Sequence, residues 1–278
     1  MLDININKFI YLYKMKTILF LLIVLSRSLA DNIINSLHVS QASYCDNQLI
    51  QSWTCKTCDT NADLYNIYDA HGEKALVGRY VDTNTLFISF RGSETIENWI
   101  DDAQFSLTCP YDNTNICVET GFYKVFEYMK NDIQSAIETN VNQYNIKNIL
   151  FTGHSLGAAV ATLMAYHFAN ENLNIELVTF GSPRIGNIDF VNDFPKIVSY
   201  RITHYYDIVP HVPQQFLHYN HIPHEIWYNE DNTELKDCND MNLEEDPLCS
   251  NSCGPIHCTS TSDHLNYLNI SMGSEGDC

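Results

Sequence analysis

The chain has 278 residues, a formal net charge of −19 at pH 7 and a hydrophobic fraction of 45%. This length suits one large α/β domain or two small ones, and the hydrophobic fraction is enough for a packed core, which excludes bulk disorder. The acidic charge repels nucleic acid and anionic membranes at long range, so we expect no nucleic-acid partner.

The N-terminal segment has the order of features that is typical of a secretory signal. Lys14 and Lys16 precede an apolar run over residues 18–25, and a small-x-small sequence ends at Ala30. The run has about half the length that crossing a membrane requires, so we expect no integral membrane span. A buried helix is the alternative interpretation of this run.

We predict that residues 1–30 are a signal peptide, with Met15 as an alternative initiator, and that residues 31–278 form one secreted domain. Removal of the signal would take away four basic residues and one acidic residue, so the formal charge would become −22. We expect the mature protein to be a monomer.

All ten cysteines lie in the predicted mature chain. An even number of cysteines in a secreted chain indicates five disulfides. Zinc is the alternative, because Cys55 and Cys58 have ligand-like spacing and Cys249, Cys253 and Cys258 form a cluster. An oxidising compartment favours disulfides, so we expect no metal.

Strands and helices alternate along the predicted domain. Apolar spacing indicates a helix over residues 121–138, and a second, almost wholly apolar helix is indicated over residues 156–169. The expected strands flank a turn at 82–84 and occupy residues 147–153, 174–183 and 196–206. This order predicts an α/β fold class, with a central mostly parallel sheet and helices on both faces.

The stretch from about 229 to 262 holds four cysteines and many acidic residues, and we interpret it as a disulfide-stapled surface insertion. Beyond it, an Asn-Ile-Ser sequon predicts a glycosylation site at Asn269.

A single serine, Ser155, lies between Gly153 and Gly157, where a predicted strand turns into a predicted helix. The glycines allow a tight turn that exposes the hydroxyl, and the N–H of Leu156 at the helix start could bind an oxyanion. A Gly-x-Ser-x-Gly match alone is weak evidence. The strand-to-helix context favours a catalytic nucleophile, which still needs a base and an orienting acid.

In this architecture the acid and the histidine follow the serine along the chain. Asp207 directly follows a predicted strand and would lie at the same sheet edge, whereas a solvated turn aspartate is the alternative. Spacing alone does not select among the histidines that follow: His211, His218, His221, His224, His257 and His264. The regular spacing from His218 to His224 suggests a metal site, but Pro223 would break a helix there, so we do not favour one.

Five blocks of the sequence resemble, in order, the fungal-type class 3 lipases, the Rhizomucor and Thermomyces lipase family. The blocks are "FRGSETIENWIDD", "GHSLGAA", "FGSPRIGN", "YRITHYYDIVPHVP" and "SDHLNYL". The resemblance runs from about residue 40 to residue 278. It implies a single-domain α/β-hydrolase fold with a serine triad and a short helical lid, and it implies no metal or organic cofactor.

The resemblance also implies roles for individual residues. Ser155 would be the nucleophile, Asp207 the orienting acid and His264 the general base. Ser93 would be the second oxyanion donor beside Leu156.

The implied lid carries Ile96, Trp99 and Ile100, which lie at i, i+3 and i+4 and form one apolar stripe. Such a stripe would cover the site in water and lie on lipid once opened. An ordinary amphipathic surface helix is the alternative.

Two further expectations concern the acyl pocket and the disulfides. The predicted walls of the acyl pocket are Ile208, Val209 and Val212. The disulfides implied by the resemblance are Cys45–Cys278, Cys55–Cys58 and Cys109–Cys117. The other four cysteines have no counterpart in the resemblance and lengthen the segment before the implied base.

The expected function is that of a secreted serine ester hydrolase that cleaves triacylglycerols at a lipid–water interface through an acyl-enzyme. Phospholipase A1 and feruloyl esterase are alternatives on the same fold. A catalytically silent lipid-binding protein is an alternative of another class. A structural cysteine-rich surface protein would explain the four extra cysteines but not the turn at Ser155.

Overall fold

A computed structural model of the chain describes residues 29–59, 61–96, 104–169, 172–238, 245–253, 257–273 and 276–278. The chain divides into two units after Asn35. Residues 29–35 are the described part of the first unit, and they are helical. The second unit, Ser36–Cys278, contains the elements discussed below. The predicted signal peptide lies almost wholly outside the described residues.

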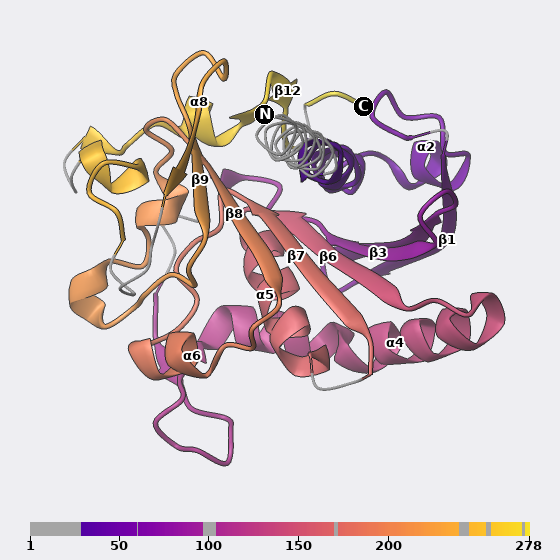
Figure 1. Ribbon diagram of the computed structural model, residues 1–278, viewed down its shortest axis with the longest axis horizontal. Helices are drawn as coiled ribbons and strands as arrows, with labels where there is room; N and C mark the ends of the chain where they lie inside the picture. The colour runs from indigo at the N-terminus through magenta and orange to yellow at the C-terminus, as the bar shows by residue number, and fades with distance from the viewer. Residues whose placement is uncertain are drawn as a thin grey trace, which may run out of the picture. The chain divides into compact units, whose positions relative to one another are not determined.

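An eight-stranded sheet forms the centre of the second unit (Figure 1). Its strands in spatial order are β1 (Ala62–Ala70), β2 (Glu73–Tyr80), β3 (Thr85–Phe90), β6 (Asn148–His154), β7 (Asn174–Phe180), β8 (Val198–His204), β9 (Glu225–Tyr228) and β10 (Leu235–Cys238). Neighbours from β3 to β9 are parallel, whereas β1, β2 and β10 pair antiparallel at the two edges. The carboxyl ends of the five parallel strands therefore share one edge.

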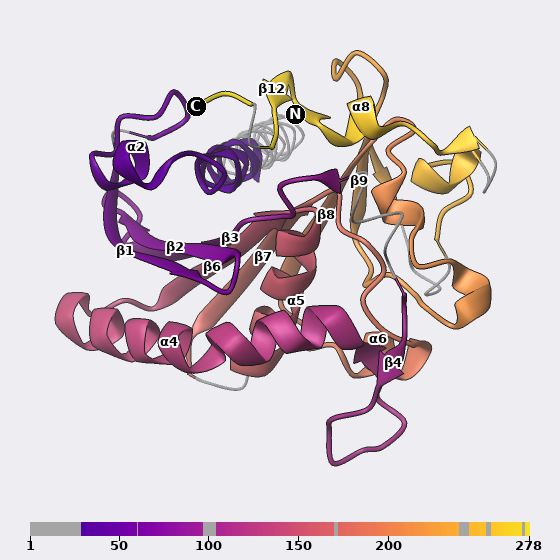
Figure 2. The ribbon, with the colours of Figure 1, turned by 180° about the vertical axis from the view of Figure 1, so that it is seen from behind.

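Helices cover both faces of this sheet (Figure 2). On one face lie α4 (Thr120–Tyr144) and α5 (Leu156–Phe168), which pack against each other and, through α5, against β3, β6 and β7. The opposite face is covered by the helical residues 36–42, where the Ser89 hydroxyl donates to the Val39 carbonyl at 2.9 Å.

The side chains of β6 alternate between these two faces, as the period of a strand requires. Ile149 and Phe151 belong to the apolar core with α4 and α5, and Phe151 stacks on Phe168. Thr152 points the other way and contacts the Ser40 hydroxyl at 3.0 Å. Because both faces are covered, the strand is apolar almost throughout, which explains why the sequence indicated a buried strand.

Shorter elements complete the unit. They are α2 (Asn47–Gln51), β4 (Leu107–Thr108), β5 (Val118–Glu119), α6 (Ile188–Asp193), η1 (Val209–His211), η2 (Gln215–Leu217), η3 (Ser250–Cys253), α8 (Thr261–His264), β11 (Asn266–Tyr267) and β12 (Ile270–Ser271). No helix of the described residues is both long enough and apolar enough to span a bilayer.

The predicted α/β class with a mostly parallel sheet and flanking helices is confirmed. Two boundaries differ by three or more residues. The helix predicted to end at 138 continues to Tyr144, where Asn145 adopts a left-handed conformation (φ 51°) that ends it. The strand predicted over 174–183 ends at Phe180, because Gly181 also turns to positive φ (54°). Strand β10, inside the predicted insertion, adds an edge to the central sheet.

The structure joins the ten cysteines in five disulfides. Three are the pairs that the resemblance implied: Cys45–Cys278, Cys55–Cys58 and Cys109–Cys117. The remaining two, Cys238–Cys249 and Cys253–Cys258, lie in the predicted insertion. These sulfurs are therefore bonded to each other and are not thiolate ligands for zinc.

Candidate active site

Ser155 occupies a strained turn between β6 and α5. Its backbone has φ 59° and ψ −130°, a conformation that costs a non-glycine residue about 1–3 kcal/mol. Its N–H donates to the Phe180 carbonyl on β7 at 3.0 Å, and its carbonyl accepts from the Ala158 N–H at 3.0 Å. The turn is therefore held by the neighbouring strand on one side and by the first turn of α5 on the other.

The two flanking glycines are required by close backbone contacts. A Cβ on Gly157 would lie 2.1 Å from the Phe90 carbonyl oxygen, and a Cβ on Gly153 would lie 2.5 Å from the Gly157 backbone. Side-chain carbons do not approach backbone atoms so closely, so only glycine permits this packing. The sequence reasoning that these glycines allow a tight turn agrees with the geometry.

Asp207 and His264 form a buried pair, although 57 residues separate them. His264 Nδ1 lies 3.0 Å from Asp207 Oδ1 and 2.9 Å from Oδ2, and both side chains are at most 1% exposed. The Val209 N–H and the Tyr267 hydroxyl also donate to this carboxylate, at 2.8 and 2.5 Å. The carboxylate thus has three donors and fixes the imidazole so that Nε2 is left for another partner.

These contacts set the protonation state of the acid. Burial by itself would raise the pKa of Asp207, but the charge and hydrogen bond of His264 and the bonds from Tyr267 and Val209 outweigh it. The net result is a pKa below the ordinary value of 3.8. Asp207 is therefore ionised at neutral pH, as an acid that orients a histidine must be.

A backbone pairing brings the histidine to the acid. The Ser260 N–H donates to the Tyr206 carbonyl, and the Ile208 N–H donates to the Ser260 carbonyl. The Ser260 hydroxyl then caps α8 by accepting from the Asp263 N–H at 3.0 Å. His264 is the last residue of this short helix, so its position follows directly from the strand-like contact at residue 260.

Gly181 lies where the three predicted catalytic residues meet. It follows Phe180, whose carbonyl holds Ser155, and a Cβ on Gly181 would lie 2.9 Å from both Asp207 Oδ2 and His264 Nδ1. The structure therefore brings Ser155, Asp207 and His264 to one sheet edge. Ser155 Oγ and His264 Nε2 are both buried, and within the described ranges neither has a hydrogen-bond partner.

Sequence reasoning missed a second layer of residues behind this edge. His154 stacks on the His264 ring with a centroid distance of 4.3 Å, and its Nε2 lies 2.8 Å from the His264 carbonyl. Its other nitrogen lies 2.8 Å from the Tyr44 hydroxyl, which also touches Gly92. Burial lowers the pKa of His154 to about 3, so this ring is neutral. A histidine directly before Ser155 in the sequence was the available signal.

Of the two predicted oxyanion donors, Leu156 directly follows Ser155 in the chain, and Ser93 follows a residue that packs against Ser155. Leu156 is the first residue of α5 and is 8% exposed. Gly92 lies so close that a Cβ on it would be 2.9 Å from Ser155 Cβ, and Ser93 follows it. The predicted lid residue Ile96 is buried, whereas Trp99 and Ile100 lie outside the described residues.

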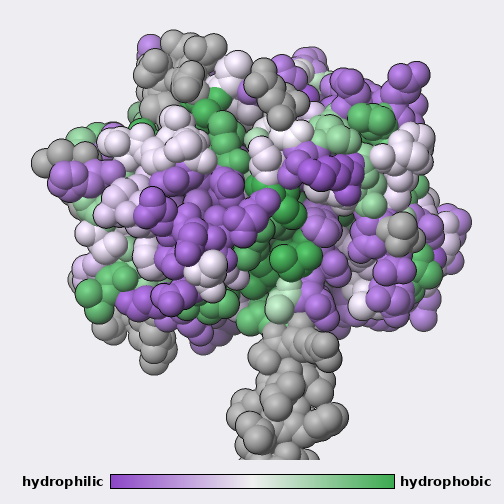
Figure 3. Space-filling model, turned by 90° about the horizontal axis from the view of Figure 1, so that it is seen from above, coloured by the Kyte–Doolittle hydropathy of each residue, from purple (hydrophilic) through white to green (hydrophobic). Residues whose placement is uncertain are grey.

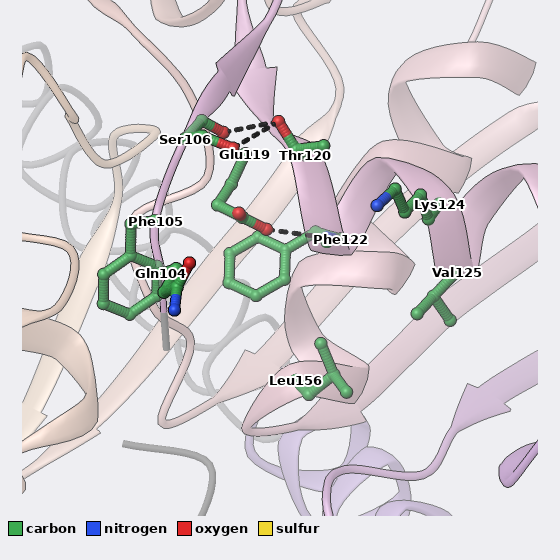
Figure 4. Close-up of a pocket in the computed structure, with 10 residues that line it drawn as sticks. Gln104, Phe105, Ser106, Glu119, Thr120, Phe122, Lys124, Val125 and Leu156 are labelled. Carbon is green, nitrogen blue, oxygen red and sulfur yellow. Dashed lines mark hydrogen bonds between the residues drawn. The ribbon is translucent and has the colours of Figure 1, made fainter. Parts of the chain in front are cut away.

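A cavity of about 310 Å³ opens beside Leu156 (Figure 4). Phe105, Phe122 and Val125 give it an apolar side, whereas Glu119 accepts from the Phe122 N–H at 2.8 Å and caps α4. The cavity was not foreseen, because its residues come from the segment after the lid and from the start of α4. The amphipathic first turns of α4 were the only signal for it.

A second cavity of about 370 Å³ includes two of the three predicted acyl-pocket residues. Ile208 and Val212 line it together with polar residues such as Gln214 and Asn251. Val209 is fully buried and is not among the lining residues, and its backbone N–H instead serves Asp207.

The predicted glycosylation residue lies on the surface. Asn269 is exposed in the turn between β11 and β12, with φ 64°. The side chain is thus accessible for modification.

Comparison with known proteins places the chain in a family. The model of the family "Lipase (class 3)" matches residues 87–217, a range that contains Ser155 and Asp207. A lipase of Rhizomucor miehei is 33% identical over 250 residues, which cover 84% of this chain and 67% of that protein. This chain belongs to the class 3 lipase family. It is a carboxylic-ester hydrolase of that family.

Other relatives agree with this placement. A secreted mono- and diacylglycerol lipase of Fusarium solani is 35% identical to this class 3 lipase over 56% of the chain, which spans 49% of that relative. A solved triacylglycerol lipase, described as having a serine-protease triad as its catalytic centre, superimposes with a TM-score of 0.78 at 29% identity. The superposition covers 88% of this chain and 96% of that structure.

Proposed function

We propose that this class 3 lipase hydrolyses acylglycerol esters, with triacylglycerols as the preferred class, through Ser155, His264 and Asp207. The observation that carries the proposal is the buried Asp207–His264 pair beside the strained turn that holds Ser155. The similarity to a triacylglycerol lipase described as having a serine triad supports it. The proposal includes secretion and action as a monomer at a lipid–water interface, and five disulfides are typical of an oxidising compartment.

The reaction would proceed in two acyl-transfer steps. His264 Nε2 takes the proton of the Ser155 hydroxyl, which attacks the ester carbonyl, and the N–H groups of Leu156 and Ser93 bind the oxyanion. The alcohol leaves with the proton from His264, and water then releases the fatty acid from Ser155. The Ser155–His264 hydrogen bond is not formed in this structure, and such bonds commonly tighten when substrate binds.

Three esters presented to the purified enzyme in parallel would test the substrate class: a triglyceride emulsion, phosphatidylcholine vesicles and methyl ferulate. We expect the highest turnover on the triglyceride, because the cavity beside Leu156 has an apolar side formed by Phe105, Phe122 and Val125. Fatty-acid release is the measurement for the lipids, and ferulate release for the third ester. Faster release from phosphatidylcholine or methyl ferulate would assign one of the alternative activities instead.

Surface charge predicts a further preference among lipid surfaces. The chain carries a net charge of −19, and hydrophilic residues cover much of the face shown in Figure 3. Like charges oppose docking, so we expect slower hydrolysis on vesicles that contain anionic lipid than on neutral ones at low salt. The difference should shrink as salt is added, because salt screens surface charges. Faster turnover on anionic vesicles at low salt would contradict this expectation.

A further inference from the structure

The loop that follows Asp207 is held from behind by one buried arginine. Arg184, which is 2% exposed, donates through Nη1 to the carbonyls of His211 and Pro213 at 2.7 and 2.9 Å. Its backbone N–H donates to the Val212 carbonyl at 2.9 Å. Three successive carbonyls of the loop thus accept from the same residue.

The same guanidinium binds the disulfide-stapled insertion. Arg184 Nε lies 2.6 Å from Glu245 Oε1, and Nη2 lies 2.7 Å from Oε2, so the pair is bidentate. The side chains of Arg184 and Glu245 are 3% and 7% exposed. Glu245 lies four residues before Cys249, which is bonded to Cys238 at the end of β10. The ion pair therefore connects the insertion to the loop after Asp207.

Both connected segments lead to the catalytic pair. At its start the loop supplies the Val209 N–H that donates to Asp207 Oδ1. The insertion leaves β10, passes Glu245 and continues to Ser260, which pairs with the backbone around Asp207 and caps the helix of His264. The ion pair thus joins the loop that supports the acid to the segment that carries the base.

We infer that the Arg184–Glu245 ion pair holds the carboxylate of Asp207 and the imidazole of His264 in the positions that ester hydrolysis requires. Glu245 is then a positioning residue for this reaction. The inference rests on the proposed roles of Asp207 and His264. Burial would raise the pKa of Glu245, but the hydrogen bonds and charge of Arg184 and the charges of His221 and Arg201 lower it to about 2.

The low pKa of Glu245 determines the pH range in which the ion pair is present. Because the folded pKa of Glu245 lies below the ordinary 4.5, its contribution to stability is complete above about pH 4.5 and is lost as the pH falls toward 2. The other groups that act on this region are Arg201, His211 and His221. Burial lowers the pKa of His211 to about 4, so that imidazole is neutral when the ion pair is fully formed.

The test compares Glu245→Gln with Asp246→Asn in the full-length protein. Asp246 is a matched control, since it lies in the same insertion but its carboxylate accepts from the Leu248 N–H. A fluorophosphonate probe counts active sites, and a soluble short-chain nitrophenyl ester gives kcat and KM for each counted site. We expect Glu245→Gln to lower kcat about 10- to 100-fold with little change in KM, because small misplacement of reacting groups costs this much.

The pH dependence of kcat gives a second readout. Because the wild-type Glu245 carboxylate is ionised above about pH 4.5, Glu245→Gln should lower kcat per counted site by the same factor at every pH above that value. Asp246→Asn should keep the wild-type profile. Wild-type kcat per counted site in Glu245→Gln would overturn the inference.

A double variant distinguishes loss of positioning from loss of fold stability. Glu245→Gln leaves a buried charge unpaired, which is strongly destabilising, whereas replacing both partners with methionine removes both charges. We expect Arg184→Met combined with Glu245→Met to regain thermal stability but to keep the low kcat. Recovery of wild-type kcat with stability would show that the ion pair only stabilises the fold. If the wild-type enzyme failed to react with the probe, the proposed function itself would fall, and this inference with it.

Discussion

Replacing Ser155 with alanine is expected to lower hydrolysis of a short-chain nitrophenyl ester by a factor on the order of 10³ or more. The hydroxyl is the proposed attacking atom, and no other side chain at the end of β6 offers an equivalent nucleophile. The variant should also lose all reaction with a fluorophosphonate probe. The fold should survive, because Ser155 Oγ makes no hydrogen bond to the described residues that alanine would remove.

Ser182→Ala is the matched control for this experiment. Ser182 is also buried near the carboxyl end of β7, but its hydroxyl bonds to the Pro183 carbonyl, so the variant should remain active. Retention of near-wild-type turnover in Ser155→Ala would show that the nucleophile has been assigned to the wrong residue.

Replacing Asp207 with asparagine is expected to lower kcat/KM by a factor of about 10³ to 10⁴. The carboxylate accepts from His264, Tyr267 and the Val209 N–H, and an asparagine side chain has only one accepting oxygen. Its amide group would favour the wrong imidazole tautomer, so Nε2 would no longer accept the serine proton. The ester assay over pH 5–9 measures the loss.

The loss in Asp207→Asn should persist across this pH range, because the pKa of Asp207 is lowered below 3.8 and the wild-type carboxylate stays ionised throughout. Asp263→Asn is the matched control. Its carboxylate lies next to His264 in sequence but accepts only a long bond of 3.3 Å from the Tyr206 N–H among the described contacts. Activity of Asp207→Asn within tenfold of wild type would contradict the proposed role of the acid.

The sequence predicted the elements whose signals are local. Ser155 lies between a buried strand and an apolar helix, and glycines flank it. Each of these three segments has a recognisable composition, so the sequence located the turn to the residue. Asp207 could be placed for a related reason, since the end of a parallel strand must lie at the shared edge. His264 could not be chosen from spacing, because a contact between residues 207 and 260 decides its position.

Contacts between distant segments account for what sequence reasoning missed. The Tyr44–His154 bond joins residues 110 apart, and the ion pair of Arg184 joins residues 61 apart. Nothing in the local composition of either segment indicates such a partner. The pairing of the two cysteine bridges in the insertion was undetermined for the same reason, since four cysteines allow three pairings.

The bond between Cys45 and Cys278 spans 233 residues and so encloses nearly the entire α/β-hydrolase domain. The backbone from Cys45 to Cys278 and this disulfide together form a closed covalent loop. A protease that cut one exposed loop would not divide it into two pieces, because the remaining covalent path would still join the cut ends. Nicked enzyme would keep all of its strands in one covalent unit for as long as this disulfide stays oxidised.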